Sequence, residues 1–307
     1  MELRHLRYLL AVAEHGNFTR AAQALHVSQP TLSQQVKQLE RSLRVQLLDR
    51  SGRTVRLTDA GEAFARYARR ALQDLAAAER AVLDVQDLSR GTLRLAMTPT
   101  FTAYLAGPLV AEFHERHPGI TMEISELTQD QIEAALLDDR LDLGIAFDDS
   151  RRPAVAATPL FVEALGLVVG AAHPCAGHPG PLPVGELDID RGAYRLALLT
   201  RDFATRLHVD GYLAEHRVRP HIAVEADSIS ALVEIVSRGT LATVLPEAIA
   251  REQPRLYPVP VEPALPARTV VLLHRDAAYR GAAARAFTEL ATGWAKARGL
   301  TGGNPLA

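Results

Sequence analysis

The sequence of 307 residues contains a single cysteine, Cys175, and no long hydrophobic run. One cysteine excludes a disulfide within the chain and suits a reducing cytoplasm, where we expect the protein to work. No apolar stretch approaches the roughly 20 residues that a membrane span requires, so we expect no membrane partner. The start, MELRHLRYLL, mixes charges with apolar residues and lacks a small-residue cleavage site, so it does not resemble a signal peptide.

An excess of one charge is also lacking, because the formal net charge is only −2. The distribution is uneven, however. Residues 1–60 contain nine Lys or Arg and five Asp or Glu, a net charge of +4, whereas the remainder carries 25 basic and 31 acidic residues. A basic N-terminal segment on an acidic body favours a polyanionic partner for that segment, although chance variation in solvated charge explains the numbers equally well.

Apolar residues at helical spacing predict three short helices in residues 3–16, 18–26 and 28–43. Thr19 is the expected cap of the second helix, and Ser28 that of the third, with Pro30 in its first turn. The apolar positions of the third helix form one stripe, namely Leu32, Val36, Leu39 and Leu43. A small β-ribbon follows, with Leu47 and Leu48 before a turn at Ser51-Gly52 and with Val55 and Leu57 after it.

The second and third predicted helices, joined by the tight segment HVSQP, match a helix-turn-helix. The major groove admits such a helix if its N-terminal residues carry small or amide side chains that reach base edges. The candidate contacts are Ser28, Gln29, Pro30, Thr31, Ser33, Gln34 and Gln35, with Arg20 and Lys37 as phosphate contacts and with Arg50, Arg53 and Arg56 of the ribbon as a wing. The alternative is a plain helical bundle, and His26-Val27 stands where glycine is frequent in this turn.

A long helix is predicted from Thr58 or Asp59 to about Ser89. Its apolar residues recur at alternating intervals of four and three, which is the spacing of a coiled-coil seam. The seam consists of Phe64, Ala68, Ala71, Leu75, Ala78, Val82 and Val85. We expect it to join two protomers, and the alternative is a helix packed on its own domain.

From Gly91 onwards, strand and helix patterns alternate, which predicts parallel sheets with right-handed crossovers. The predicted strands are residues 92–99, 120–127, 141–147, 164–170, 195–200, 221–226, 241–246 and 268–275, and the predicted helices are residues 101–119, 129–139, 204–217, 228–239 and 281–297. Two successive sets of this kind predict two α/β lobes.

Ligands of α/β folds bind beyond the carboxyl ends of strands, where helix N-termini attract anions. The candidate effector-binding residues in such places are Thr98, Thr100, Phe101, Thr128, Phe147, Thr200, Phe203, Ala204, Thr205 and Ser228. Each Ser or Thr taken alone fits the role of a helix cap equally well. The stronger prediction is that Thr100, Thr128 and Thr205 converge on one cleft.

The stretches FTRAAQALHVSQPTLSQQVKQLE, LLDR and VRLTDAGEAF, in this order, resemble the LysR-type transcriptional regulators. The resemblance implies an all-α winged helix-turn-helix in residues 1–58, a linker and dimerisation helix in residues 59–90, and an α/β effector-binding domain in residues 91–307. That domain would have two Rossmann-like lobes, as in periplasmic binding proteins, joined by two crossover strands. Lobe I would comprise about residues 91–161 and 267–300, and lobe II about residues 162–266. Dimers or tetramers, operator DNA and RNA polymerase are the implied partners.

Within the family, the stretches MTPTFTAYLAGPL, FATR, EADSISA and LATVLPEAIA resemble regulators of cyanate operons. This implies an activator of cyanate degradation that responds to cyanate, a small anion, bound between the lobes. A different small anion or a carboxylate is the alternative effector. The resemblance implies neither a cofactor nor a metal.

Two other classes of protein fit the α/β part. An enzyme lacks support, because the sequence contains no G-x-G-x-x-G, phosphate-binding loop or G-x-S-x-G motif. His173, Cys175 and His178 are metal-ligand types, but we expect them in a solvated Pro/Gly-rich loop. A solute-binding protein would be exported and would not need the first 90 residues. Sequence-specific binding to promoter DNA in a gel-shift experiment distinguishes a regulator from both.

Overall fold

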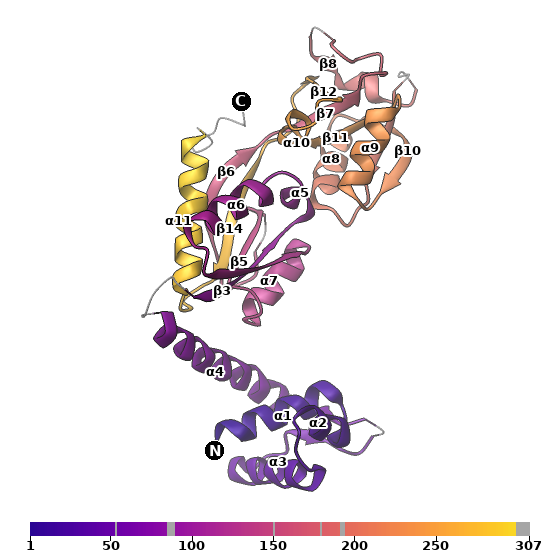
Figure 1. The fold of residues 1–307 in the computed structure, drawn as a ribbon. Coiled ribbons are helices and arrows are strands. Elements are labelled where there is room, and N and C mark those ends of the chain that lie inside the picture. The colour runs from indigo at the N-terminus through magenta and orange to yellow at the C-terminus, as the bar shows by residue number, and fades with distance from the viewer. Residues whose placement is uncertain (53, 85–89, 150, 179, 191–193, 299–307) are drawn as a thin grey trace. The chain divides into compact units, whose positions relative to one another are not determined.

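The computed structural model describes residues 1–52, 54–84, 90–149, 151–178, 180–190 and 194–298. Two compact units, residues 1–83 and 84–307, each have their own core. Figure 1 labels most of the helices and strands of both units.

The first unit follows the predicted order of helices and ribbon. Its elements are α1 (Leu3–His15), α2 (Phe18–Ala24), α3 (Gln29–Leu43), β1 (Leu48–Asp49), β2 (Arg56–Leu57) and α4 (Asp59–Asp84). The two short strands pair in antiparallel fashion, as expected for a ribbon.

Polar side chains fix where α2 and α3 begin. The carboxamide of Asn17 accepts hydrogen bonds from two backbone N–H groups of the first turn of α2, at 2.8 and 3.2 Å. Thr19 lies inside that turn, so the prediction that Thr19 caps the helix is wrong. Ser28 caps α3 as predicted, because its hydroxyl accepts from the Thr31 N–H at 3.3 Å.

Two residues in left-handed conformations shape the turns around α2. His26 has a φ of 53°, so the tight turn before α3 closes without the glycine that adopts this conformation most easily. Gly16, with a φ of 59°, ends α1, and its carbonyl accepts a hydrogen bond of 2.9 Å from the Val55 N–H. This hydrogen bond holds the part of the ribbon that leads into β2 against the C-terminal end of α1.

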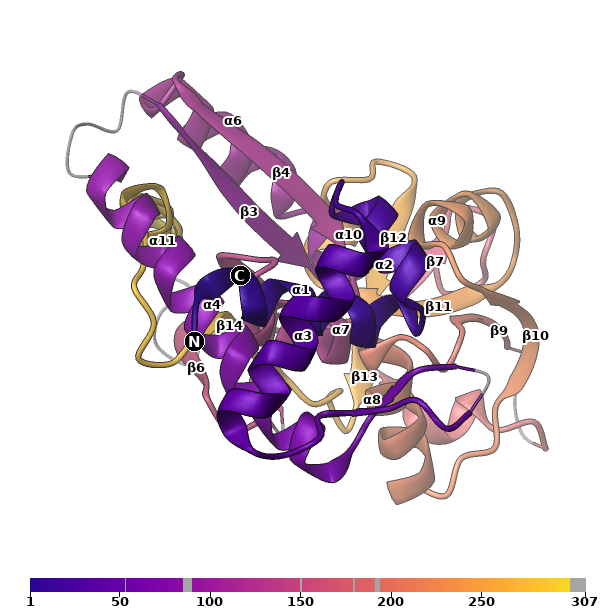
Figure 2. The ribbon, with the colours of Figure 1, turned by 90° about the horizontal axis from the view of Figure 1, so that it is seen from below.

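The core of the first unit is built by one face of each helix. Leu32, Val36 and Leu39 of α3 are at most 1% exposed, as the apolar stripe predicts. Leu43 is 38% exposed, so its prediction as a buried position is wrong; α3 ends there and Arg44 turns into a left-handed conformation. Figure 2 shows α1, α2 and α3 packed together, which leaves the opposite face of α3 uncovered within this unit.

The long helix α4 begins at a polar cap and a close backbone contact. The Thr58 hydroxyl accepts from the Gly61 N–H at 3.0 Å. A Cβ at Gly61 would lie 2.0 Å from the Leu47 carbonyl oxygen, so only glycine lets α4 start against the ribbon. The helix is described to Asp84, and residues 85–89 of the predicted helix lie outside the described residues.

The second unit contains two five-stranded sheets, each the centre of one lobe. Lobe I has the strand order β4-β3-β5-β14-β6. Its elements are β3 (Gly91–Met97), α5 (Pro99–Thr102), α6 (Ala106–Arg116), β4 (Ile120–Glu126), α7 (Gln129–Leu137), β5 (Leu143–Phe147), β6 (Val155–Glu163), β14 (Arg268–Arg275) and α11 (Ala282–Ala297). In Figure 1, α11 and α6 lie along one face of this sheet and α7 lies on the other.

Two predictions for lobe I are wrong in part. The predicted helix 101–119 is divided into α5 and α6, because Pro108 has no N–H to continue a helix through this region. The sheet is mixed rather than parallel, since β14 is antiparallel to both β5 and β6. The apolar pattern predicts no strand at β6, whose burial does not alternate regularly along the chain, although the resemblance implies a crossover strand between the lobes.

Lobe II has the strand order β10-β9-β11-β7-β12, in which β7 is antiparallel to both of its neighbours. Its elements are β7 (Leu165–Gly170), β8 (Leu182–Pro183), η1 (Val184–Leu187), β9 (Arg195–Leu199), α8 (Ala204–Glu215), β10 (His221–Ala226), α9 (Ile229–Arg238), β11 (Ala242–Pro246), α10 (Glu247–Arg251), β12 (Leu256–Val259) and β13 (Val261–Glu262). The prediction of a parallel sheet therefore holds for β10, β9 and β11 and is wrong for the two pairs that β7 makes.

The chain passes from lobe I to lobe II after β6 and returns before β14. These two strands pair with each other along their whole length, from Arg275 opposite Val155 to Arg268 opposite Glu163. The two connections between the lobes therefore leave from the same end of one ladder. No helix within the described residues is long and apolar enough to cross a membrane.

Candidate DNA-binding surface and effector cleft

Most of the predicted base-contacting residues lie on the exposed face of α3. Ser28, Gln29, Pro30, Thr31, Gln34 and Lys37 are exposed, whereas Ser33 and Gln35 are half-buried. The Gln35 side-chain oxygen is buried and has no hydrogen-bond partner among the described residues, so this amide is turned partly inward. The Ser28 hydroxyl contacts the Thr31 hydroxyl at 2.7 Å in addition to its capping bond.

The basic residues near the ribbon differ in how free their charges are. Arg20 and Arg56 are exposed, and Arg53 lies outside the described residues. Arg50 is bound at 2.7 Å by Glu40, whose other carboxylate oxygen accepts from the Leu47 and Leu48 N–H groups. Because Glu40 already neutralises Arg50, Arg56 and Arg20 are the stronger candidates for phosphate contacts.

The predicted seam of α4 changes character along the helix. Phe64 is half-buried against the core of the first unit, and Ala68 is buried. Ala71, Leu75 and Ala78 are exposed, and the exposed fraction of Leu75 is 43%. The side chain of Val82 and all of Val85 lie outside the described residues. The first turns of α4 thus belong to their own unit, and the next two leave an apolar stripe uncovered in one chain.

Seven of the ten predicted effector residues line one cavity of about 300 Å³ in the second unit. They come from both lobes and are Thr98, Thr100, Thr128, Phe147, Phe203, Ala204 and Thr205. Thr128 precedes α7 and Phe203 precedes α8, so the N-termini of two helices face the cavity. The predicted convergence of Thr100, Thr128 and Thr205 is found in the structure.

Three predicted effector residues lie elsewhere. Phe101 is fully buried behind the cavity, where its ring packs 4.8 Å from that of Phe147. Ser228 caps α9, and its hydroxyl accepts from the Ala231 N–H at 3.3 Å. Thr200 lines a separate cavity of about 680 Å³.

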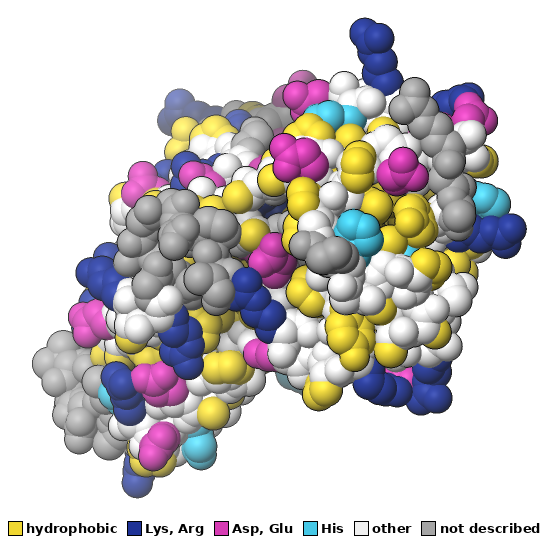
Figure 3. Space-filling view, turned by 90° about the horizontal axis from the view of Figure 1, so that it is seen from above, with side chains coloured by type: hydrophobic (Ala, Val, Ile, Leu, Met, Phe, Trp, Pro, Cys, Tyr) yellow, Lys and Arg dark blue, Asp and Glu magenta, His cyan; other side chains and the backbone are white. Residues whose placement is uncertain are grey.

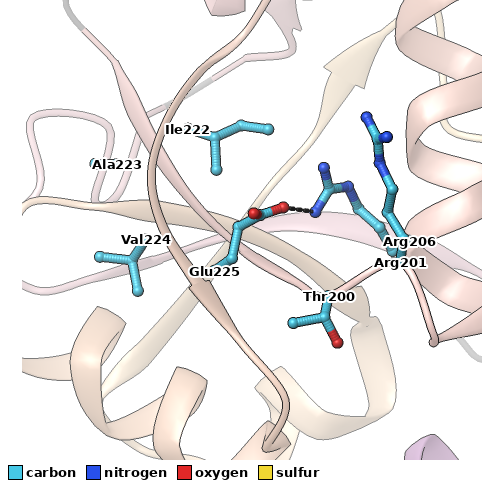
Figure 4. Close-up of a pocket in the computed structure, with 7 residues that line it drawn as sticks. All are labelled: Thr200, Arg201, Arg206, Ile222, Ala223, Val224 and Glu225. Atoms are coloured by element: carbon cyan, nitrogen blue, oxygen red, sulfur yellow. Dashed lines mark hydrogen bonds and ion pairs between the residues drawn. The ribbon is translucent and has the colours of Figure 1, made fainter.

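The separate cavity is lined by the segment that follows β9, by Arg206 of α8 and by residues 222–225 of β10, and the Arg206 and Glu225 charges are already paired. Figure 4 shows Arg206 pointing across it to Glu225, with which it forms an ion pair of 2.5 Å. Arg206 also binds Asp210 at 2.7 Å and the Leu199 carbonyl at 2.7 Å. This cavity therefore offers fewer free donors than its arginines suggest.

Sequence reasoning missed the acidic residues at the mouth of the inter-lobe cavity. Asp130, Asp149 and Asp202 are exposed there, and the cavity is lined by no Lys or Arg among the described residues. The distance from His208 Nε2 to Asp149 Oδ1 is 3.9 Å. Asp130 lies in the first turn of α7, whereas Asp149 and Asp202 follow strands of lobe I and lobe II, so no single spacing pattern in the sequence links the three carboxylates.

A buried polar network lies behind Phe147 and Thr205. Glu163 accepts a hydrogen bond of 2.7 Å from the Tyr104 hydroxyl and one of 2.5 Å from Arg268. Burial raises the pKa of Glu163, and Arg268 and Tyr104 oppose this effect. Burial also raises the pKa of Tyr104, and the neighbouring carboxylate raises it further. Tyr104 therefore remains a hydrogen-bond donor at neutral pH.

The loop that contains His173, Cys175 and His178 is solvated only in part: His178 is exposed as predicted, whereas the prediction is wrong for His173 and Cys175. The two residues are 4% and 1% exposed, because the loop folds over the second lobe's core. The His173 Nδ1 accepts a hydrogen bond of 3.0 Å from the Cys175 N–H, and its ring stacks on Tyr194. A hydrogen bond with Cys175 and partial burial raise the pKa of Tyr194 to about 12. No group of metal-binding side chains occurs among the described residues.

The charged side chains of the second unit do not gather by sign on the face drawn in Figure 3. Lys and Arg appear there at several separate places, between apolar and acidic side chains. That face therefore does not resemble the surface of a protein that binds a polyanion.

Two family models match the chain and together span most of it. The model described as a bacterial regulatory helix-turn-helix protein of the lysR family matches residues 3–62, and the LysR substrate binding domain matches residues 86–296. The chain therefore belongs to the LysR family of bacterial DNA-binding transcriptional regulators. The prediction of the family, and of its two-part fold, is confirmed.

Particular relatives agree with this assignment. The DNA-binding transcriptional dual regulator OxyR of Escherichia coli K12 is 31% identical over 279 residues, which are 90% of each chain. A full-length variant of OxyR from Pseudomonas aeruginosa has a similar structure, with a TM-score of 0.69, 27% identity and coverage of 95% and 93% of the two chains. CbnR complexed with its target DNA has a TM-score of 0.56 and 26% identity over 96% of this chain and 100% of that one. These relatives are transcriptional regulators rather than enzymes, as the sequence predicted.

Proposed function

We propose that this LysR-type regulator binds its operator through α3 and changes its activity when a small ligand occupies the cavity between the lobes. The observation that carries the proposal is the cavity itself, which both lobes line and which holds the hydroxyls of Thr98, Thr100, Thr128 and Thr205. A ligand that spans the lobes can favour one lobe arrangement over another, and only such differential binding changes an equilibrium.

The effector that we propose first is a small anion, with cyanate as the first compound to test. The N-termini of α7 and α8 offer free N–H groups and partial positive charge, and threonine hydroxyls can donate to an anion. A cavity of about 300 Å³ is larger than a three-atom anion needs, and three aspartates stand at its mouth. A larger carboxylate is therefore the alternative effector. If cyanate is the effector, the proposed physiological role is activation of a cyanate-degradation operon.

Calorimetric titration of the full-length protein with cyanate, azide and a panel of small carboxylates tests the effector. We expect one compound to bind, and its binding to be lost in Thr100→Val, which keeps the shape of the side chain and removes a hydroxyl in the cavity. DNA bending by this variant, with and without the compound, tests the response. An unchanged response in Thr100→Val contradicts the assignment of the cavity.

Dimers joined by α4, assembled further into tetramers, are the proposed form on DNA. The exposed stripe of Ala71, Leu75 and Ala78 supports this, because a heptad seam left in water is a surface for a second helix. Two copies of α3 held at a fixed distance would read two half-sites of an operator. Contact with RNA polymerase is part of the same proposal and follows from the role of an activator.

Operator binding by α3 is tested with two glutamine variants. Gln34→Ala removes an exposed amide near the start of α3, and we expect roughly a tenfold or greater loss of affinity for the operator. Gln38→Ala is the control, because Gln38 is also exposed but lies one turn further from the N-terminus. Equal losses in both variants, or none in Gln34→Ala, contradict the proposed orientation of the helix.

A further inference from the structure

A buried ion pair lies where the chain passes between the lobes, behind the wall of the inter-lobe cavity. Glu163 ends β6, Arg268 begins β14, and the two residues are opposite each other in the ladder. Arg268 Nη2 lies 2.5 Å from Glu163 Oε2, and the exposed fractions of the two side chains are 3% and 0%. The pair is therefore shielded from water at the root of both lobe connections.

The guanidinium of Arg268 also contacts both walls of the cavity. Its Nη2 donates to the Thr205 hydroxyl oxygen at 3.2 Å, and its Cζ lies 3.6 Å from the centroid of the Phe147 ring. Thr205 stands in the first turn of α8 in lobe II, whereas Phe147 ends β5 in lobe I. Both residues line the cavity. One charged group thus connects a residue of each lobe that a ligand would touch.

The Arg268 guanidinium is held more strongly by its contacts with lobe I than by its contact with lobe II. On the side of lobe I, Glu163 holds Arg268 by charge, Tyr104 fixes Glu163, and Phe147 covers the guanidinium face. On the side of lobe II, the Thr205 hydroxyl is the hydrogen-bond partner of Arg268 in the described part of the chain. The Arg268 Nε and Nη1 donors are buried without a partner there. Losing Thr205 would therefore leave the guanidinium with its contacts in lobe I alone.

We propose that Arg268 is a positioning residue of the effector cavity, which holds Thr205 of lobe II against Glu163 and Phe147 of lobe I and so sets the lobe arrangement of the ligand-free protein. This rests on the proposed function, in which lobe arrangement carries the response. A ligand that takes the Thr205 hydroxyl or displaces the Phe147 ring weakens the bond to Arg268. The lobes are then free to adopt the arrangement that the ligand favours.

The distance between the lobes in the absence of ligand tests this role. Spin labels are attached to cysteines that replace Glu115 on α6 and Glu215 on α8, both of which are exposed. Cys175 remains in place, because a thiol that is 1% exposed resists labelling. The labelled full-length protein is mixed with an excess of unlabelled protein, so that the measured distances lie within one chain.

The decisive variant is Thr205→Val, which keeps the shape of the side chain and removes the acceptor. A hydrogen bond to a charged group of this kind changes an equilibrium by roughly tenfold or more, so we expect a shifted or clearly broadened distance distribution. Arg268→Lys should act in the same direction, because an ammonium cannot bind Glu163 and Thr205 with the geometry of a guanidinium. Thr205→Val with the distance distribution of the unmodified protein overturns the proposal.

The control is Thr243→Val. Thr243 lies in β11 of lobe II, is fully buried, and its hydroxyl has no hydrogen-bond partner among the described residues. We expect this variant to have the same inter-lobe distance distribution as the unmodified protein. A shift as large as that of Thr205→Val would overturn the proposal, because it would show that any buried threonine of lobe II acts alike. Operator binding is measured on the same proteins. Failure of operator binding refutes the proposed function, whereas the distance comparison decides the role of Arg268 in either case.

Discussion

Removing either member of the Glu163–Arg268 pair should destabilise the second unit far more than removing both. The variants are Glu163→Leu, Arg268→Met and the double variant. Each single change leaves one charge buried, because the side chains of this pair are at most 3% exposed. A lone buried charge typically costs about 3–5 kcal/mol of unfolding free energy, whereas apolar replacement of a whole pair is often neutral.

The magnitudes follow from the contacts that each change removes. Arg268→Met leaves Glu163 with the Tyr104 hydroxyl as its hydrogen-bond donor and also removes the contact with the Phe147 ring. We expect a loss of about 4 kcal/mol. Glu163→Leu leaves the Arg268 guanidinium with the Thr205 hydroxyl as its hydrogen-bond partner among the described residues, beside the contact with the Phe147 ring, and we expect a loss of at least about 3 kcal/mol. The double variant should lose less than either single variant, so the coupling energy is several kcal/mol.

Urea unfolding measured by tryptophan fluorescence provides the assay. Trp294 is the one tryptophan of the chain, is 9% exposed on α11, and lies 6.5 Å from the Phe161 ring of β6. Its emission therefore reports the unit that contains the ion pair and not the DNA-binding unit. Equal slopes of the unfolding transitions are needed for the comparison. Losses that simply add in the double variant would refute the reasoning.

Three further predictions concern other parts of the chain. Asn17→Ala should cost about 1 kcal/mol of stability in the first unit by removing the cap of α2, while Thr19→Ala should cost less than about 0.5 kcal/mol; the reverse order in thermal unfolding would contradict the observed cap. Leu75→Gln should weaken self-association in sedimentation experiments, whereas Arg66→Gln, about 180° away around α4, should not. Burial lowers the pKa of His173 below its ordinary 6.5, so stability is retained above pH 6.5 and lost as the pH falls through the lower folded pKa. A pH series of melting temperatures should show this loss in the unmodified protein and a flatter curve in His173→Asn.

The parts of the fold that the sequence predicts best are those governed by local spacing. The stripe of Leu32, Val36 and Leu39 and the cap at Ser28 depend on neighbours in one helix, and both are found in the structure. The cap of α2 was harder to predict, because Asn17 and Thr19 are both good cap residues and only the backbone shows which one precedes the helix. The prediction for Leu43 fails for a related reason, since periodicity does not reveal the last turn of a helix.

Strand direction is the part of the fold that spacing cannot supply. An alternation of strands and helices favours parallel sheets, but β14 enters the first sheet after the chain has returned from lobe II. It therefore runs antiparallel to β5 and β6, although its own sequence, RTVVLLHR, looks like any buried strand. The residues that line the cavity also come from segments that are far apart in the sequence. The rule that ligands bind beyond the carboxyl ends of strands nevertheless selected seven residues that line it.

Arg268 shows why the remaining site residues escaped prediction. At the first position of a strand pattern, an arginine is expected to point to solvent, because a buried guanidinium needs a partner. That partner is Glu163, which lies 105 positions earlier in the chain and ends a strand without a regular pattern. The two become neighbours only through the antiparallel register of β6 and β14. Each of these charged residues taken alone favours exposure, so both are buried because the topology pairs them. The double variant, which removes both charges, distinguishes this effect of pairing from a property of either residue.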